Sequence, residues 1–377
     1  MQADIIIKNG RVIDPKNHVD RVGDIAIQGK KLIPAQPEMT AKTVIDAAGC
    51  IVTPGLIDSH AHIFERGTDS GINPDLSMLP LGVTTVADAG SAGVYTYRSF
   101  LDRLALCRIK TKFYLHISPT GQVTHQYPES IRPDKWNMEK FEEAVDTCGD
   151  KLLGFKLRVS RNVVGEDCLY DLEQALNLGE RFHKRIVVHV TDPAVSQAKI
   201  ASLLRPGDIF CHVFHGRGYT ILENDKVLKE IWDARERGVI FDCCHGSINF
   251  NFAVAEKALA CGFLPDVLTS DMNAVTWNRS PLFNLPVVMS KFLLMGLDIP
   301  EIIALVTSNA AKVIGEEGAL GTLEKGTCAD VAILKVEDKR TRFVDAEGQT
   351  REGKRLFRVM ASILDGTIVF RSQDICE

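Results

Sequence analysis

Two histidines stand two residues apart near the start of the chain, at the end of the apolar run GLIDSHAHIF (55–64). In a β-strand, residues i and i+2 point to the same side. At ~3.3 Å per residue their Cα atoms lie ~6.6 Å apart. His60 and His62 could therefore converge on one metal ion, at the ~2.0–2.1 Å that a zinc–nitrogen bond requires. We expect this pair to begin a metal site.

Four more residues suited to such a site lie in later strand-like runs. They are Lys156 in GFKLRVS, His189 in RIVVHV, His212 in IFCHVFHG and Asp271 in VLTSDM. Any one of these has an ordinary alternative, since a single histidine is more often hydrogen-bonded than metal-bound, and an aspartate can cap a turn. Six such residues near one end of five runs favour a shared site. In a (β/α)8 barrel, the active site lies at the C-terminal ends of the strands.

The remainder of the pattern predicts those strands. Eight β-rich runs begin at Leu56, and most are separated by stretches with apolar residues at helical spacing. The runs cover residues 56–62, 83–90, 112–118, 152–160, 185–190, 209–216, 239–246 and 267–272. This alternation predicts an α/β fold, a (β/α)8 TIM barrel whose parallel strands are buried on both faces.

The two ends of the chain have a different pattern. Residues 1–54 contain short alternating strands separated by Asn-Gly, Gly-Lys and Ala-Gly turns, and residues 316–377 return to that style. We predict that both ends build one small β-sandwich subdomain beside a barrel formed by residues 55–315. Two unrelated appendages are the alternative.

Composition and charge exclude several classes of protein. With 44 basic and 49 acidic residues the net charge is −5, and no basic run indicates nucleic acid. The start, MQADIIIKNG, lacks the features of a signal peptide, and no uncharged run is long enough to span a bilayer. Ten cysteines without a CxxC pair indicate reduced thiols, and we take Cys243-Cys244 as packing residues.

We therefore expect a cytoplasmic protein with a small-molecule substrate, and with neither nucleic acid nor membrane as a partner. A homo-oligomer is compatible with these expectations, because many barrels associate.

Lys156 is the unusual member of the expected metal site. An ammonium group is repelled by divalent cations and is not a ligand. It could lose its proton, as buried lysines can. It could also react with carbon dioxide to form a carbamate, whose two oxygens could bridge two metals. The carbamate makes chemical sense of a lysine among histidines.

Together these residues resemble the amidohydrolase superfamily of metal-dependent hydrolases. The resemblance rests on VTPGLIDSHAH, the strand lysine, the later histidines, SDM and the closing segment TSNAAKVIGEEGALGTLEKGTCADVAIL, so it covers nearly the whole chain. GVTTVADAGSAGVYTYRSF (82–100) is similar to the amidohydrolase/deacetylase branch, which is dihydroorotase-like.

The resemblance implies two divalent metal ions, with zinc expected first and manganese or iron also compatible. It implies that His60 and His62 bind one ion with Asp271, and that His189 and His212 bind the other. Lys156, as N6-carboxylysine, would bridge both.

The same resemblance implies hydrolysis of an amide or ester by a metal-bridging hydroxide, with Asp271 as general base. We expect a deacylase that removes an acetyl or other small acyl group from a small carboxylate-bearing substrate. A cyclic amidase, such as a dihydroorotase or hydantoinase, is the alternative. Against it, dihydroorotases carry arginine two residues after the second histidine, where this chain has Phe64, although Arg66 lies nearby.

Two further classes are less favoured. A deaminase typically uses one metal and does not require the bridging lysine. A catalytically silent scaffold is the alternative outside enzymes, and the complete ligand set argues against it.

Two residues are candidates for substrate contacts. Arg158 lies two residues after Lys156 and should face the same side of the strand, where a guanidinium could hold a carboxylate by two parallel hydrogen bonds. A salt bridge at the barrel rim is its structural alternative. His245 ends the seventh run and could donate to the substrate carbonyl, or simply pack. DAGSAG (88–93) could form a turn near the pocket.

Overall fold

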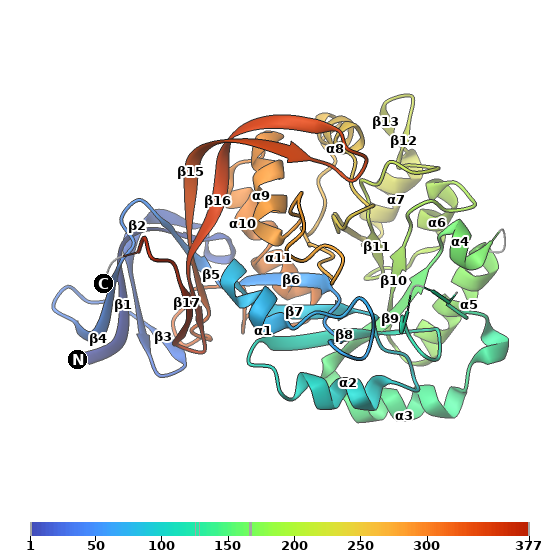
Figure 1. Ribbon diagram of the computed structural model, residues 1–377, viewed down its shortest axis with the longest axis horizontal. Helices are drawn as coiled ribbons and strands as arrows, with labels where there is room; N and C mark the ends of the chain where they lie inside the picture. The colour runs from blue at the N-terminus through green and yellow to red at the C-terminus, as the bar shows by residue number, and fades with distance from the viewer. Residues whose placement is uncertain (1, 125, 128, 166–167, 376–377) are drawn as a thin grey trace.

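The structure is a computed structural model that describes residues 2–124, 126–127, 129–165 and 168–375 (Figure 1). Its larger part contains a parallel sheet of seven strands in the order β14-β11-β10-β9-β8-β7-β6. The strands are β6 (Leu56–Ala61), β7 (Val83–Ala89), β8 (Lys110–His116), β9 (Leu152–Arg158), β10 (Arg185–His189), β11 (Ile209–Cys211) and β14 (Ile240–Asp242). Each overlaps one of the first seven runs expected from the sequence, although β11 and β14 are much shorter than the runs at 209–216 and 239–246.

The eighth expected strand is not regular. Residues 267–272 make only two single parallel bridges, Asp242 with Val267 and Ala61 with Met272. The segment thereby joins the two edge strands, β14 and β6, and closes the ring of a (β/α)8 barrel. Asp271 interrupts regular pairing because its backbone is left-handed, with φ 54°. Its N–H donates to the His60 carbonyl at 2.9 Å, which brings the two side chains to the same rim.

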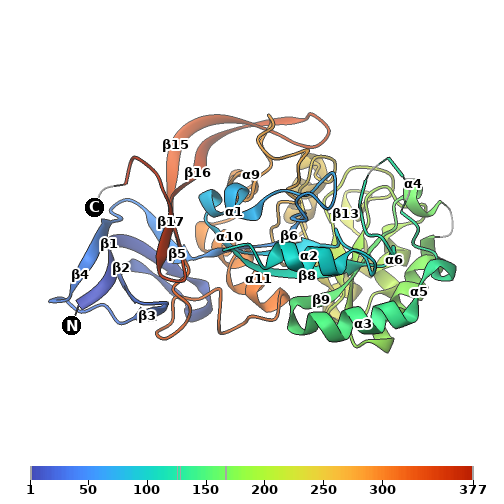
Figure 2. The same cartoon turned by 60° about the horizontal axis from the view of Figure 1, so that its bottom comes forward.

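Helices cover the outside of this sheet, as Figures 1 and 2 show. They are α1 (Pro74–Ser77), α2 (Tyr97–Leu104), α3 (Met138–Cys148), α4 (Arg161–Val164), α5 (Cys168–Arg181), α6 (Gln197–Leu203), α7 (Lys229–Glu236), α8 (Phe252–Ala260), α9 (Leu285–Leu294), α10 (Ile299–Leu305) and α11 (Ser308–Val313). Short 3-10 turns lie at Pro15–Asn17, Leu79–Leu81, Pro133–Lys135 and Gly149–Lys151.

Helix α3 illustrates why these segments are helical. The Asn137 side chain caps its first turn by accepting from the Lys140 N–H. Phe141, Ala144 and Cys148, three and four residues apart, form its buried face.

Among the described residues, no helix is long and apolar enough to cross a membrane.

The two ends of the chain share a second, mixed sheet of eight strands. Its order is β17-β16-β15-β5-β1-β2-β3, and β4 pairs with β1. The strands are β1 (Gln2–Asp14), β2 (Val19–Gln28), β3 (Lys31–Ile33), β4 (Thr40–Asp46), β5 (Ile51–Pro54), β15 (Val331–Val344), β16 (Thr350–Leu364) and β17 (Thr367–Arg371). Antiparallel pairing of β5 with β15 joins the ends. The remaining strands, β12 (Leu222–Glu223) and β13 (Lys226–Val227), form a separate small hairpin.

The hairpin of β15 and β16 extends from the mixed sheet over the barrel. In Figures 1 and 2 it arches above α9, and its tip lies near α8. Phe343 and Phe357 are buried in the same apolar core as the barrel strands. At the tip, the Asp345 carboxylate accepts from the Phe252 N–H at 3.0 Å, and the Ala346 N–H donates to the Phe250 carbonyl at 3.0 Å. The tip therefore holds the chain that follows β14.

Candidate active site

Seven of the eight predicted site residues line one cavity of about 130 Å³. They are His60, His62, Lys156, Arg158, His189, His212 and Asp271. Four of them lie on parallel strands, His62 and His212 directly follow β6 and β11, and Asp271 lies in the irregular segment 267–272, so all seven meet at the rim formed by the carboxyl ends of the strands. The side chains are almost completely buried, with only Arg158 partly exposed.

The His62 ring is oriented by a buried serine and aspartate. Its Nδ1 lies 2.9 Å from the Ser91 hydroxyl, which donates to the Asp88 carboxylate at 2.8 Å. Because the hydroxyl gives its hydrogen to Asp88, it accepts from Nδ1–H of His62. Nε2 of His62 therefore presents a lone pair to the cavity. The DAGSAG segment supplies both partners, so it is indeed a turn beside the pocket.

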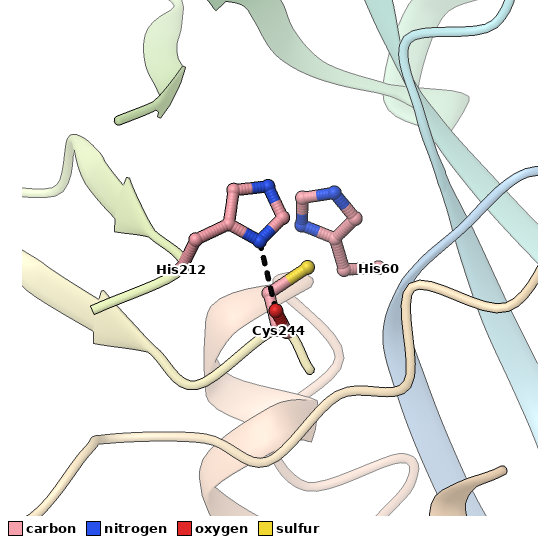
Figure 3. Close-up of side chains that lie close together, drawn as sticks. All are labelled: His60, His212 and Cys244. Atoms are coloured by element: carbon pink, nitrogen blue, oxygen red, sulfur yellow. Dashed lines mark hydrogen bonds between the residues drawn. The ribbon is translucent and has the colours of Figure 1, made fainter. Parts of the chain in front are cut away.

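His60 and His212 are oriented in the same way. Nδ1 of His60 lies 3.1 Å from the Asp242 carboxylate, and Nδ1 of His212 lies 2.8 Å from the Cys244 carbonyl, as the dashed line in Figure 3 shows. A carbonyl oxygen can only accept, so Nδ1 of His212 carries the hydrogen. Nε2 of His212 is buried without a hydrogen-bond partner among the described residues. Such fixed tautomers are typical of metal-ligating histidines.

Burial keeps these rings neutral. It lowers the pKa of His60, His189 and His212 well below the usual value, and the positive charge of Lys156 lowers each further. Burial alone would raise the pKa of Asp271. Any positive charge on the rings of His62, His212 or His60 lowers that pKa below its usual value, as a cation bound among the same rings would.

The acceptor atoms that face one another in the site favour a bound cation. Nε2 of His62 lies 3.4 Å from Oδ1 of Asp271, and Nε2 of His60 lies 4.0 Å from the same oxygen. With Nδ1 protonated, the His62 nitrogen and the carboxylate oxygen are both acceptors. One donor atom each from His60, His62 and Asp271 lies within 4.8 Å of the others, a spacing that one metal ion could span.

Two other groups of donors contain cysteine. One joins His60 and His212 with Cys244, the three side chains drawn in Figure 3, and the other joins His60 with Cys211 and Asp242. Burial raises the pKa of both thiols well above the usual value, so they stay protonated near neutral pH and are poor ligands. We therefore assign the metal position to His60, His62 and Asp271 rather than to the cysteine groups.

Local backbone geometry adapts the chain to this site. His212 and Asp271 both have left-handed backbones, with φ of 65° and 54°. This conformation costs a non-glycine residue about 1–2 kcal/mol. Two glycines give room for site residues: a Cβ at Gly90 would collide with the Lys156 side chain, and one at Gly246 would collide with the Asp271 carboxylate.

The structure does not place His245 on the cavity. Its ring is fully buried and stacked between Phe250 and Phe283, with centroid distances of 4.5 and 4.9 Å. Its two nitrogens lie 2.8 Å from the Gly246 carbonyl and 2.7 Å from Nζ of Lys291. The expectation that His245 contacts the substrate is therefore wrong. His245 was expected to end the seventh strand, but β14 ends at Asp242, and the ring packs in the core against Lys291 of α9.

Several residues of the site were not predicted from the sequence. Asn249, on the cavity wall, donates to Oδ2 of Asp271 at 3.0 Å and accepts from the Thr191 hydroxyl at 2.7 Å. Asp242 orients His60, and Ser91 with Asp88 orients His62, although the sequence predicted for the last two only a turn near the pocket. The alternation of Asp242 with its apolar neighbours in VIFDC, which points it into the barrel, was the available signal.

Known proteins similar to this chain carry several names. No protein-family model matches it. A deacetylase from Enterococcus faecalis is 31% identical over 374 residues, which cover 98% of this chain and 99% of that protein. A deacetylase from Agrobacterium fabrum is 28% identical over 88% of this chain and 82% of its own length.

The similar solved structures extend over nearly the whole chain. One described as an adenine deaminase has 31% sequence identity and a TM-score of 0.89, covering 98% of this chain and all of its own. One described as a dihydroorotase has 27% identity and a TM-score of 0.87, covering 98% of each chain. With such relatives matched from end to end, this chain belongs to the amidohydrolase superfamily of metal-dependent hydrolytic enzymes.

Proposed function

We propose that the protein is a deacylase that removes an acetyl or other small acyl group from a small carboxylate-bearing amide or ester. One observation carries this proposal: a lysine, four imidazoles, a carboxylate and an arginine line the same small cavity. The first six suit a hydrolytic metal centre, and the arginine suits a carboxylate on the substrate. Both relatives described as deacetylases support the acyl group.

Two divalent ions, zinc first, fit the donor set. His60, His62 and Asp271 would hold one ion, His189 and His212 the other, and carboxylated Lys156 would contact both. The unpartnered Nε2 of His212 and the facing acceptors of His62 and Asp271 support this assignment. When bound, such ions lower the pKa of a water molecule and polarise an acyl carbonyl.

A modified Lys156 also accounts for the charge of the site. Its side chain is only 1% exposed, and Nζ lies 3.2 Å from Nε2 of His60. An ammonium there would compete with a metal ion for the same lone pair. Carboxylation replaces that positive charge with a negative one and supplies two oxygen ligands, so we propose N6-carboxylysine at this position.

Asp271, Asn249 and Arg158 have the remaining roles in the proposed reaction. Asp271 accepts the proton of the attacking water and transfers it to the leaving nitrogen or oxygen. Asn249 donates to Oδ2 of Asp271, which leaves Oδ1 directed toward the imidazoles. Arg158 holds the carboxylate of the substrate and fixes the distance from that group to the scissile bond.

A cyclic amidase is the second candidate. A dihydroorotase from Streptococcus pyogenes is 51% identical over 65 residues, but this stretch is only 17% of this chain. Phe64 is buried against Phe100 at a centroid distance of 4.7 Å. Arg66 lines a separate surface cavity. Neither is among the described residues that line the metal cavity, so Arg66 does not take the place of the arginine that dihydroorotases carry where this chain has Phe64.

Acetate release tests the proposal. Enzyme prepared with zinc and bicarbonate would be given N-acetyl amino acids and O-acetyl 2-hydroxy acids of both hands, beside dihydroorotate and hydantoins. The control is Asp271→Asn, with metal content and thermal unfolding measured in parallel. We expect stereoselective acetate release that the variant loses. Ring opening without acetate release would identify a cyclic amidase instead, and no turnover by a fully metallated enzyme would contradict both substrate classes.

We also propose a division of the chain into a barrel of residues 55–315 and a β-sandwich-like subdomain of residues 1–54 and 316–377. The proposed partner is a small-molecule substrate in the cytoplasm, with neither nucleic acid nor membrane bound. Size-exclusion chromatography with light scattering would show whether the protein forms a homo-oligomer.

A further inference from the structure

A buried carboxylate holds the arginine that faces the cavity. Nη1 of Arg158 donates to Oε1 of Glu129. The Glu129 side chain is only 8% exposed, and it is not among the described residues that line the cavity, whereas Arg158 is. Glu129 comes from the long connection between β8 and α3, so a loop residue anchors a side chain of strand β9.

His116 supports the same carboxylate from β8. Nδ1 of His116 accepts from the Ser118 N–H at 2.9 Å, so the ring hydrogen resides on Nε2. That Nε2 lies 2.9 Å from the second oxygen of Glu129. Burial alone would raise the pKa of Glu129, but His116 and Arg158 together lower it to about 2. The carboxylate is thus ionised, hydrogen-bonded to Arg158 through Oε1 and close to the His116 ring through Oε2, which has no hydrogen-bond partner among the described residues.

The guanidinium retains donors for another anion. Arginine has five N–H hydrogens in a rigid planar fork. Glu129 uses Nη1, while Nε is buried and has no hydrogen-bond partner in the described part of the chain. A buried donor without an acceptor is unfavourable. A carboxylate that enters the cavity would supply the acceptor, and with two oxygens it could bind the Nε side of the fork in parallel.

We propose that Glu129 is the positioning residue of a carboxylate subsite on Arg158. It fixes one end of the guanidinium, and thereby directs the Nε side toward a carboxylate held beside the metal ligands. This inference rests on the proposed function, because it assumes a carboxylate-bearing substrate. It adds that a residue outside the cavity determines how well that group is recognised.

The experiment measures binding at Arg158 independently of turnover. Phenylglyoxal modifies accessible arginines, and mass spectrometry gives the rate at Arg158 in the metal-loaded enzyme. The probes are 2-ethoxypropanoate, an inert analogue of an acylated 2-hydroxy acid, and the neutral 2-ethoxypropanamide. In the unmodified protein, we expect the carboxylate to protect Arg158 and the amide to give no protection.

Two substitutions separate position from charge. Glu129→Gln keeps an oxygen that can accept from Nη1, but its NH2 group then faces the Nε2 hydrogen of His116, so the half-protecting concentration of 2-ethoxypropanoate should rise, and by less than in Glu129→Ala. Glu129→Ala removes the acceptor, and that concentration should rise about tenfold or more. Glu142→Ala, which breaks the exposed pair of Glu142 with Arg181 on the neighbouring surface, is the matched control and should change nothing.

The outcomes distinguish this inference from the proposed function. If 2-ethoxypropanoate fails to protect the unmodified protein, then no carboxylate binds Arg158, and the proposed substrate class falls together with the subsite. If it protects the unmodified protein and Glu129→Ala equally well, only the role of Glu129 is overturned. Thermal unfolding and metal content verify each variant, and Glu129→Met, which keeps the volume without an acceptor, replaces an alanine variant that does not fold.

Discussion

Replacement of Asp242 by asparagine should weaken metal binding by forcing the wrong tautomer on His60. Oδ1 of Asp242 accepts from the Thr269 hydroxyl at 2.6 Å and from the Cys244 N–H at 3.0 Å. The backbone N–H cannot reverse its role, so the oxygen of an asparagine must stay on that side. Its NH2 group then faces Nδ1 of His60, which Oδ2 contacts at 3.1 Å.

The size of the effect follows from this contact. Two donors cannot face each other, so the hydrogen of His60 moves to Nε2, the nitrogen that would bind metal. A hydrogen bond to a charged group is worth about 1.5–3 kcal/mol. Since ~1.4 kcal/mol is tenfold in an equilibrium constant, the metal dissociation constant should rise roughly 10- to 150-fold. This range agrees with the ~10–100-fold loss usual for groups that orient metal ligands.

Competition for zinc against a chromophoric chelator would measure this change, with metal content after dialysis as a second readout. Asp58→Asn is the matched control. Asp58 is as buried as Asp242, and burial raises the pKa of each to about 7, but its side chain accepts from Ser270 and from the backbone N–H of His60 and bonds to no imidazole ring among the described residues. Equal loss of zinc in the two variants, or none in Asp242→Asn, would refute the tautomer argument.

Three further predictions concern other groups near the site. Asn249→Ala should slow turnover about fivefold with little change in KM, because Asp271 loses a hydrogen bond worth about 1 kcal/mol; a change confined to KM would contradict this role. Burial lowers the pKa of Lys291 to about 7, below its value in the unfolded chain. The unfolded state therefore binds more protons between about pH 7 and 10, and the free energy of unfolding should rise with pH through that window by up to ~1.4 kcal/mol per unit. Chemical denaturation across this range should show a smaller rise in Lys291→Met, and an identical slope in both proteins would be evidence against the assignment. Iodoacetamide should label the exposed Cys261 quickly and leave Cys211 and Cys244 unlabelled in the folded protein. Peptide mass spectrometry can measure this labelling. Equal labelling of the three cysteines would mean that the buried region around Cys211 and Cys244 opens to solvent.

The sequence predicted those parts of the site that depend on strand periodicity. His60 and His62 alternate with small and apolar neighbours, and the period of two predicted that both face one side; both line the cavity, although β6 ends at Ala61, between them. Arg158 follows Lys156 by the same rule, and both line the cavity. The parallel order of seven strands followed from the alternation of strand and helix patterns.

Features set by loop geometry could not be predicted in this way. Asp271 was expected in a regular strand, yet its left-handed backbone leaves only two bridges there. His245 was expected on the cavity, but the direction of its side chain depends on the turn after Cys244 and on aromatic rings from distant segments. Glu129 comes from a connection without a periodic pattern, so only the folded chain shows its contact with Arg158.

The tip of the β15–β16 hairpin has a consequence for the order in which the enzyme is made. The segment that supplies Ser247, Ile248 and Asn249 to the cavity is followed directly by Phe250 to Phe252, which the tip holds. These contacts join residues 93 and 96 positions apart, as in the bonds of Asp345 with Phe252 and of Glu347 with Asn251. A ribosome therefore finishes all six candidate ligands well before it makes the support for one wall of the cavity. During synthesis this wall of the cavity therefore lacks its support until the hairpin has been made. Assembly of a complete site becomes one of the last events in the synthesis and folding of the chain.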